Sequence, residues 1–515
     1  MKALFTLLCA CFILHFPILL QAQHQVDWIR TVGSFDPNEA HKLEDVEWSN
    51  DGKVSAVGIG DTGRPQALNI AWDASGNELW RIQPTLLAND TASEFFRLCP
   101  YVAVNGQQRY YSVGDYKLND GRSQVLYLQS DQIGTAIRQL EFTTGTDDHL
   151  ADAVSDPNGE LYMVGNRQMG ANAPRPFLDW YEINGTIGYV LSYSTFTESY
   201  GHSVAHFGGL AAIHFTNPNA SNLHSVYYHN MPFNGQLSGF QDYTWTPAPG
   251  HGGFDASHAG DFAVAGQKNG DGMVQFTTYQ GALTGSYQIT DPIFPSNDFI
   301  TTNVLFDAHR RLYSVTAVEA SNNALLSRYN LSGQMIWQDT VQGTNTPNHR
   351  NTDIIAVEND KFFYVSSGHD ATYLYIYDSL GTRLNKVQLS DPNFDHVELT
   401  GIAVTPWEDV YICGSSKAGA NGREGILIKV ASGMVAAEPK PQQRLKLYPN
   451  PSQGQLRIAS QAPIQHIEIL SLQGQLLRSW KGDTHLLDLQ ELPSGMYLAR
   501  ITTTLGTATQ RFVLK

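Results

Sequence analysis

One phrase recurs along most of this chain: an apolar strand rich in Tyr and Val that ends in a glycine or another small residue. Examples are Val54–Gly58, Leu161–Gly165 and Val410–Gly414. The strands end at residues 58, 114, 165, 214, 266, 316, 366 and 414, at intervals of 48 to 56 residues. A second phrase, a strand that runs into a glycine turn, keeps the same interval; its glycines are Gly76, Gly134, Gly185, Gly235, Gly281, Gly333, Gly381 and Gly433. Two different phrases that recur at the same interval indicate a true structural repeat.

A repeat of about fifty residues built from strands, with no helical segment between them, is typical of a β-propeller with one four-stranded blade per repeat. The sequence therefore predicts an all-β fold with a propeller over residues 23–433. Eight copies predict eight blades, or seven if the copy near His214 is not a full blade. The segment Val26–Val32 resembles the Trp-led strand that ends other repeats. We expect it to pair beside Gly425–Val430 and close the ring, which removes exposed strand edges.

The pattern Ala71-x-Asp73-x-x-Gly76-x-x-x-Trp80 resembles the tryptophan-docking motif of eight-bladed quinoprotein dehydrogenases. The resemblance implies that the tryptophan packs between blades, which is a structural role. Only two copies keep the tryptophan. Those enzymes often use adjacent cysteines at the cofactor, and Cys99 and Cys413 are not adjacent. The repeat as a whole resembles secreted bacterial propeller repeats in general, so no cofactor is assigned.

Short apolar runs alternate with turn residues in the last seventy residues. This pattern predicts a small β-sandwich at 445–515, after a linker at 434–444 that contains Pro439 and Pro441. The seven expected strands are Leu445–Tyr448, Gln455–Ala459, Ile464–Leu470, Gln475–Trp480, His485–Leu489, Met496–Thr503 and Thr507–Leu514.

Several separated motifs of this tail resemble the C-terminal sorting domain of the type IX secretion system. They are Tyr448-Pro449-Asn450-Pro451 with Gly454, the turn at Gly474, the Leu492–Tyr497 segment with Gly495 and Tyr497, and the terminal Lys515. The resemblance implies an Ig-like sandwich that the outer-membrane export machinery recognises. In that family the domain is often removed, and the cargo is sometimes attached to surface lipopolysaccharide.

The first residues have the pattern of a secretory signal peptide at 1–22. Lys2 forms a basic start, an apolar run follows from Ala3 to Leu20, and cleavage is expected between Ala22 and Gln23. A lipoprotein would need Cys11 as its modified residue, but the apolar run continues past it. No second run of about 18 apolar residues follows, so no transmembrane segment is expected in the mature chain. The protein is expected to pass through the periplasm and to be secreted or displayed on the outer cell surface.

Charge is divided unevenly along the chain. Residues 23–443 carry a net charge of −21, and residues 444–515 carry a net charge of +4. Together with Lys2 these give the net charge of −16 for the whole chain. Nucleic acid and anionic membrane surfaces need clusters of Lys and Arg. The acidic body therefore argues against both as partners.

No catalytic, cofactor-binding or metal-ligating residue is identified from motifs. GxSxG, HExxH and Walker patterns are absent. Carboxylates near glycine, as in Asp156–Gly159, Ser49–Gly52 and Asp391–Asn393, do not fit a calcium loop and are interpreted as β-turns. Cys99 and Cys413 lie in apolar strand contexts and are expected to be buried small hydrophobic residues. Scattered strand and loop positions are expected for the histidines, which are His202, His206, His214, His224, His229, His251 and His258.

The aromatic pairs Trp180-Tyr181 and Tyr227-Tyr228 and the segment Tyr373–Tyr377 could stack on sugars, but in a propeller most aromatic side chains fill the space between blades. The favoured hypothesis is a ligand- or partner-binding module, with an extracellular glycan or protein as ligand and the type IX machinery as partner of the tail. The alternative is an extracellular enzyme acting on polysaccharide, a lyase or a glycoside hydrolase. Such enzymes need two carboxylates, or a Tyr and His pair, that converge.

Deletion of residues 445–515 in the native host is expected to stop the body from appearing outside the cell, because the resemblance implies that this tail is the export signal. Cell fractionation with detection of the body measures the effect. Continued appearance of the truncated body outside the cell would contradict the assignment.

Overall fold

The structure is a computed structural model, and its secondary structure consists of strands. It describes residues 24–515 apart from 34–40, 50–51, 62–64, 85–89, 104–106, 142–145, 157, 169–172, 183–186, 193–199, 208–209, 218–222, 231–236, 245, 248–252, 279–282, 291–297, 319–320, 322, 343–353, 367–371, 390–395, 418–422, 433–445, 449–451, 453, 460–463, 472–475, 483–485, 491 and 504–505. Within these residues no helix is long and apolar enough to cross a membrane.

Residues 24–432, as far as they are described, form eight antiparallel sheets, here called blades 1 to 8 in chain order. Blade 1 consists of β2 (Lys42–Trp48), β3 (Val54–Asp61), β4 (Pro65–Trp72) and β5 (Glu78–Ile82); blade 2 of β6 (Asp90–Val102), β7 (Gln108–Leu118), β8 (Ser123–Asp131) and β9 (Ala136–Glu141); blade 3 of β10 (Asp147–Ser155), β11 (Leu161–Gln168), β12 (Arg175–Tyr181) and β13 (Ile187–Ser192); blade 4 of β14 (Tyr200–Phe207), β15 (Leu210–Asn217), β16 (Leu223–Asn230) and β17 (Leu237–Tyr243).

Blade 5 differs in that its first strand is divided into two segments, β18 and β19, which both pair with β20. Blade 5 consists of β18 (Thr246–Pro247), β19 (Phe254–Ala256), β20 (Asp261–Lys268), β21 (Asp271–Thr278) and β22 (Leu283–Ile289); blade 6 of β23 (Phe299–Phe306), β24 (Leu312–Val318), β25 (Asn323–Tyr329) and β26 (Met335–Gln342); blade 7 of β27 (Ile355–Glu358), β28 (Lys361–Ser366), β29 (Tyr373–Asp378) and β30 (Arg383–Gln388); blade 8 of β31 (His396–Val404), β32 (Val410–Lys417), β33 (Arg423–Ala431) and β1 (Gln25–Val32).

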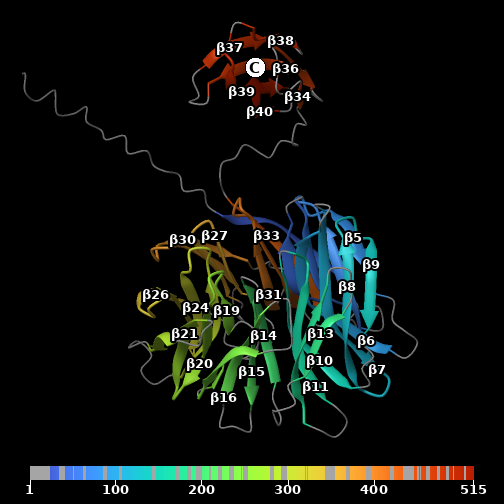
Figure 1. Cartoon of the computed structure of the whole chain (residues 1–515), viewed down its shortest axis with the longest axis vertical. Helices are drawn as coiled ribbons and strands as arrows, with labels where there is room; N and C mark the ends of the chain where they lie inside the picture. The colour runs from blue at the N-terminus through green and yellow to red at the C-terminus, as the bar shows by residue number, and fades with distance from the viewer. Residues whose placement is uncertain are drawn as a thin grey trace, which may run out of the picture. The chain divides into compact units, whose positions relative to one another are not determined.

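The blades form a closed ring. The first strands contact one another in the order β2, β6, β10, β14, β19, β23, β27, β31 and back to β2. At the seam, β1 pairs antiparallel with β33, with Val32 opposite Gly425 and Val26 opposite Val430, so the blue N-terminal strand joins the orange sheet of blade 8 (Figure 1). The predicted eight-bladed propeller and its closing strand are confirmed. The copy near His214 is a full blade, because β15 lies between β14 and β16.

The glycine that ends the recurring phrase is explained by a bulge in the strand beside it. The first strands of six blades carry this bulge, at Leu43/Asp45, Phe95/Arg97, Leu150/Asp152, Gly201/Ser203, Thr301/Asn303 and Leu399/Gly401. A Cβ at Gly58 would lie 2.0 Å from the Lys42 carbonyl oxygen, and one at Gly114 would lie 1.9 Å from that of Glu94. A side chain at these positions would therefore force the first two strands of the blade apart.

Tryptophans dock between blades as the motif predicts. Trp80 of blade 1 lies against Gly134 of blade 2 and donates from Nε1 to the Gln132 carbonyl at 3.2 Å. Trp337 repeats the contact against Gly381 of blade 7. A third tryptophan, Trp28 of the closing strand, packs on Gly76 of blade 1 and donates to the Ala74 carbonyl at 3.2 Å.

Four of the aromatic residues weighed as sugar platforms fill the core instead. Trp180 is 7% exposed, and Tyr181, Tyr375 and Tyr377 are at most 1% exposed. Tyr181 packs among residues of blades 2 and 3, and Tyr375 and Tyr377 pack among residues of blades 6 and 7. Burial of such large side chains supplies much of the hydrophobic free energy that holds adjacent sheets together.

Residues 433–515 belong to a second compact unit, separate from residues 23–432. Its strands form two sheets, in the orders β34-β35-β38 and β37-β36-β39-β40. All seven predicted strands are present, with bounds β34 (Lys446–Tyr448), β35 (Gln455–Ala459), β36 (Ile464–Leu470), β37 (Leu476–Lys481), β38 (Leu486–Asp488), β39 (Gly495–Thr503) and β40 (Gly506–Leu514). Leu456, Leu487, Ile467 and Phe512, from both sheets, meet in one fully buried core. The prediction of a β-sandwich is confirmed, and its Ig-like topology stays a prediction.

Two glycines of blade 2 offer a matched test of tryptophan docking. Gly121 and Gly134 both close a four-residue turn with a positive φ, 88° and 84°. A Cβ at Gly134 would lie 2.5 Å from Trp80 Cγ, whereas one at Gly121 meets nothing within 4 Å. We expect Gly121→Ala to cost about 1 kcal/mol of unfolding free energy from backbone strain. Gly134→Ala should cost about 2 kcal/mol more from overpacking, as measured by urea denaturation. Equal losses would contradict the docking role.

Candidate functional site in the channel

The first strands line the axis of the ring, so their side chains are the ones that can face the central channel. Because strands alternate in direction within a blade, each first strand begins at the face where consecutive blades are connected, here called the joining face. It ends at the opposite face, here called the turn face, where the turn to the second strand lies. The bulges lie along the first strands between these two faces, and bulges commonly re-aim side chains near functional sites.

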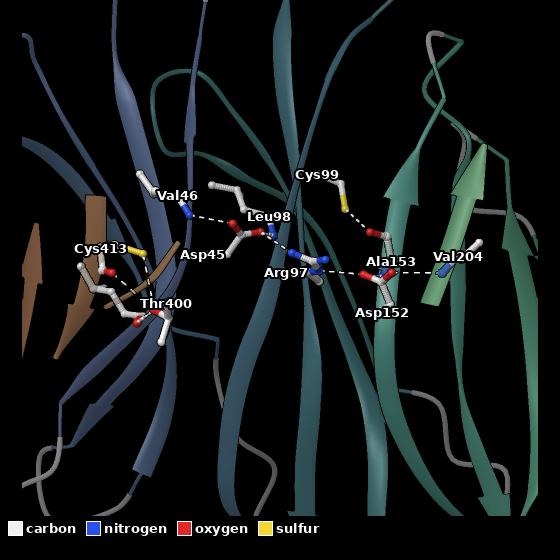
Figure 2. Close-up of polar contacts among 11 residues, drawn as sticks. Asp45, Val46, Arg97, Leu98, Cys99, Asp152, Ala153, Val204, Thr400 and Cys413 are labelled. Carbon is white, nitrogen blue, oxygen red and sulfur yellow. Dashed lines mark hydrogen bonds and ion pairs between the residues drawn. The ribbon is translucent and has the colours of Figure 1, made fainter. Parts of the chain in front are cut away.

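Three charged residues follow the bulges of blades 1, 2 and 3 and connect these blades. Arg97 Nε donates to Asp152 Oδ1 at 2.7 Å, and Arg97 Nη1 lies 3.7 Å from Asp45 Oδ2. Figure 2 shows the three side chains in a row across neighbouring sheets. Asp45 and Asp152 are 6% and 4% exposed. Removing one partner of such a buried pair typically costs about 3–5 kcal/mol, so this row holds the three blades together.

Backbone N–H groups also donate hydrogen bonds to the two carboxylates of this row. Asp45 accepts hydrogen bonds from the N–H groups of Val46 at 2.8 Å and Leu98 at 2.9 Å. Asp152 repeats the arrangement with the N–H groups of Ala153 at 2.9 Å and Val204 at 3.0 Å (Figure 2). Each aspartate therefore binds its own strand and the first strand of the next blade.

The equivalent positions in blades 4, 6 and 8 carry no charge. The residues that follow the bulges there are Ser203, Asn303 and Gly401. The charged side chains at this level thus lie on one side of the channel, along blades 1 to 3.

A carboxyl pair lies nearer the joining face of the same blades. Glu44 of β2 and Glu94 of β6 hydrogen-bond to each other, and Lys42 Nζ lies 2.8 Å from Glu44 Oε1. Burial, together with the neighbouring Glu44 carboxylate, raises the pKa of Glu94 to about 8. Burial also raises the pKa of Glu44. The pair therefore holds a shared proton at neutral pH.

A second titratable pair continues this row into blade 3. Asp115 lies opposite Glu94 in the strand register, and its Oδ2 is 3.5 Å from His149 Nδ1. The Leu150 N–H also donates to Asp115 at 2.9 Å. Burial raises the pKa of Asp115, and the hydrogen bond to Asp115 raises the pKa of His149.

We call Lys42, Glu44, Glu94, Asp115 and His149 the channel cluster. Its side chains can accept hydrogen bonds from a positively charged ligand, because carboxyl groups are in excess. Within the described residues, no group of three or more His, Cys, Asp or Glu side chains is placed to hold a metal ion. Motif searching missed the cluster because its residues come from three blades. The only sequence signal is the glycine-ended phrase, since Gly58, Gly114 and Gly165 oppose the carbonyls of Lys42, Glu94 and His149.

Three of the histidines expected to be scattered lie together in blade 4. His214 Nε2 is 2.8 Å from His224 Nδ1, and the His202 ring is 5.6 Å from that of His214. The interpretation as scattered residues is therefore wrong for these three, because the strand register brings β14, β15 and β16 side by side. His206 stacks on Tyr162, and His258 is exposed on a turn. The side chains of His229 and His251 lie outside the described residues.

The cysteines and the Asp-containing turns agree with their predicted roles. Cys99 and Cys413 are buried and unbridged, and burial raises the pKa of both thiols. The Gly159 N–H donates to the Asp156 carbonyl at 3.0 Å, and the Gly52 N–H donates to that of Ser49 at 2.9 Å, as in β-turns. The third predicted turn, 391–393, lies outside the described residues.

The residues predicted to form the sorting motif lie at strand ends of the tail. Tyr448 ends β34, and Gly495 begins β39. Gly454 has a φ of 100°, and a Cβ at this position would lie 2.7 Å from Cγ of Gln490. The Tyr497 hydroxyl donates to the Pro493 carbonyl at 2.7 Å, and the Lys515 N–H donates to that of Ser452 at 2.8 Å. The other predicted residues, Pro449, Asn450, Pro451, Gly474, Ala22 and Gln23, lie outside the described residues.

The buried histidine pair predicts an acid-sensitive blade. Burial lowers the pKa of His214 well below its usual value and that of His224 to about 3. Between pH 6.5 and about 3 the unfolded chain therefore binds protons that the folded chain does not. The unfolding free energy should be fully present above pH 6.5. Below it, the free energy should fall by up to about 1.4 kcal/mol per pH unit for each histidine.

Denaturation midpoints measured from pH 7.5 to 4 check this expectation. The double variant His214→Phe/His224→Phe should lose the part of the pH dependence that comes from the pair, whereas His258→Gln, at an exposed turn, should keep it. An unchanged pH dependence in the double variant would show that other groups cause the acid sensitivity.

Comparison with known proteins identifies the tail. Residues 446–515 match the family described as the secretion system C-terminal sorting domain. A search of curated proteins gave no match. Among solved structures, puromycin hydrolase is 14% identical with a TM-score of 0.45; the match covers 77% of this chain and 62% of that one, less than two thirds of its length.

Two further solved structures are similar to the body. Pseudomonas aeruginosa periplasmic gluconolactonase is 12% identical with a TM-score of 0.43, covering 77% of this chain and all of that chain. The β-propeller domain of the Pyrococcus furiosus Trilobed protease is 10% identical with a TM-score of 0.37, covering 76% and 98%. At these values the similarities carry no argument about activity. The tail is assigned: residues 446–515 are a type IX secretion system C-terminal sorting domain.

Proposed function

We propose that this chain is an exported binding protein whose propeller captures a positively charged ligand at the channel cluster. The sorting domain indicates export to the cell surface or the extracellular space. The route through the periplasm, after removal of residues 1–22, is part of the proposal. Recognition of the tail by the export machinery is assigned to the motif from Tyr448 to Pro451 and to Gly454, Gly474, Gly495, Tyr497 and Lys515.

The carboxyl pair carries this proposal. Glu44 and Glu94 come from different blades, are held together by a shared proton, and have Lys42 as their nearest cation. A ligand ammonium group can replace that proton and interact with both carboxylates, which relieves their mutual repulsion. The acidic balance of the body favours the approach of cations to the channel.

An enzyme acting on polysaccharide is the second candidate, because the raised pKa of Glu94 keeps a proton on this residue at neutral pH. A general acid requires this protonation state. Glycosidases, however, hold their two carboxyl groups about 5–9.5 Å apart to leave room for the sugar or water. Glu44 and Glu94 hydrogen-bond to each other, so the arrangement favours binding over glycosidic cleavage.

Binding of spermine to the purified full chain tests the proposal by isothermal titration calorimetry. We expect saturable binding that weakens as salt rises, and a loss of about tenfold or more in Glu44→Gln/Glu94→Gln, since each missing charge contact contributes about 1 kcal/mol or more. Asp120→Asn, on an exposed turn of blade 2, is the matched control and should bind as the wild type does.

The same proteins are incubated with polysaccharides while reducing ends are measured. Release of sugar fragments that Glu94→Gln abolishes would replace the binding function with the enzymatic one. Failure of the wild type to bind spermine, or equal binding by the double variant, would rule out a cation site at the channel cluster.

A further inference from the structure

The turns between first and second strands share one five-residue form in most blades. The N–H of the first residue donates to the carbonyl of the fifth, and the N–H of the fourth donates to the carbonyl of the first. Both hydrogen bonds occur at residues 49–53, 156–160, 257–261, 307–311 and 405–409. The fourth residue has a positive φ; it is glycine in blades 1, 3 and 5, Arg310 in blade 6 and Glu408 in blade 8.

Two residues distinguish the turn of blade 8 from the turns that have glycine at the fourth position. Glu408 adopts a φ of 69°, a conformation that non-glycine residues rarely adopt. The third position holds Trp407, whereas the described turns of blades 3, 5 and 6 have Asn158, Ala259 and His309 there. Trp407 is 58% exposed. Among the described residues, it is the one aromatic side chain in the group of exposed large hydrophobic residues.

A second indole fixes the orientation of Trp407. Trp48, at the last position of β2, meets it edge to face, with 5.4 Å between ring centroids and 85° between ring planes. Both residues lie where first strands end, so the pair is on the turn face, between blades 8 and 1. The channel cluster lies toward the beginning of the first strands, with Asp115 on the neighbouring strand β7. The two features are therefore at different ends of the channel.

Hydrogen bonds from three directions hold this turn in place. Within the turn, the Asp409 N–H donates to Thr405 Oγ1 at 3.0 Å. From blade 7, Asn359 Nδ2 donates to the Pro406 carbonyl at 2.6 Å, and Lys361 forms an ion pair with Glu408. His24, which precedes the closing strand, contacts the Glu408 carbonyl at 3.1 Å. A strained residue persists only where its surroundings fix it, and such strain is often found at functional sites.

We propose that Trp407, supported by Trp48, is a stacking platform for a neutral sugar ring, which gives the turn face a glycan-binding site. An exposed, rigid indole offers its face to the apolar side of a sugar, while polar neighbours bind the hydroxyl groups. Asn359 and Asp360 are exposed on the adjacent turn of blade 7. Three carboxylates, Glu358, Asp360 and Glu408, outnumber the two cations there, Lys361 and Arg311. The local charge therefore disfavours sugars that carry carboxylates.

The surroundings of the platform favour a sugar over a protein partner. A specific protein interface needs roughly 800 Å² per partner with an apolar centre. The other strongly exposed apolar side chains on turns, Ile133 and Leu380, are on turns between third and fourth strands, away from the axis. The indole pair is thus a small apolar spot within a polar frame.

Calorimetric titration of the full chain with cellohexaose, mannohexaose and xylohexaose tests the platform. Tryptophan fluorescence is recorded in parallel. The wild type should bind at least one of these neutral hexamers more tightly than it binds hexagalacturonate, with a change in indole emission. Trp407→Ala should weaken that binding roughly tenfold or more, and Trp407→Phe should keep part of it.

Leu380→Ala, which removes a more exposed apolar side chain from blade 7, is the matched control and should not change affinity. If Trp407→Ala lowers the unfolding temperature, Trp407→Gln serves as the second variant. The proposal fails if no neutral hexamer binds, if hexagalacturonate binds as tightly, or if a folded Trp407 variant binds as the wild type does. It also fails if Trp407→Ala converts a dimer to a monomer in sedimentation, because the pair would then be a contact between copies.

Discussion

In six of the eight blades the chain places one extra residue in the first strand, and much of the molecule depends on that bulge. The bulge brings a carbonyl oxygen so close to the second strand that only glycine fits at Gly58, Gly114, Gly165 and Gly414. It also turns the following side chain toward the next blade, where Asp45 and Asp152 accept backbone hydrogen bonds. One local distortion thus accounts for the repeating glycine and for a polar link between blades.

The two halves of the ring are linked by different interactions. Blades 1 to 3 are connected near the axis by Asp45, Arg97 and Asp152. Blades 5 to 8 are connected on the turn face by ion pairs between successive turns, which are Asp261–Arg310, Asp360–Arg311 and Glu408–Lys361. Exposed pairs of this kind contribute little one by one. Their value here is positional, because they fix Arg310 and Glu408 in conformations that glycine would adopt freely.

Prediction from the sequence succeeded where a local geometry requires one particular type of residue. The strand-and-glycine phrase predicted eight blades, Val26–Val32 predicted the closing strand, and alternating runs after Leu445 predicted the strands of the tail. Trp28 could be recognised as strand-forming, but its docking on Gly76 depends on ring closure. The channel cluster could not be predicted, because Glu44, Glu94 and Asp115 lie in unrelated local contexts and meet only through the register of two blades. Trp407 was missed for a similar reason: its exposure follows from the turn that carries it.

The closing strand has a consequence for the order in which this protein can mature. The partner of β1 is β33, almost four hundred residues further along the chain, so ring closure is a contact of very high sequence separation and is expected to be slow. Until β33 is present, blades 1 and 8 keep exposed edges that invite pairing with other chains. Only about a dozen residues separate β33 from the sorting domain. A chain long enough to carry its export signal is therefore also long enough to close its ring, whereas a chain that stops before β33 lacks both.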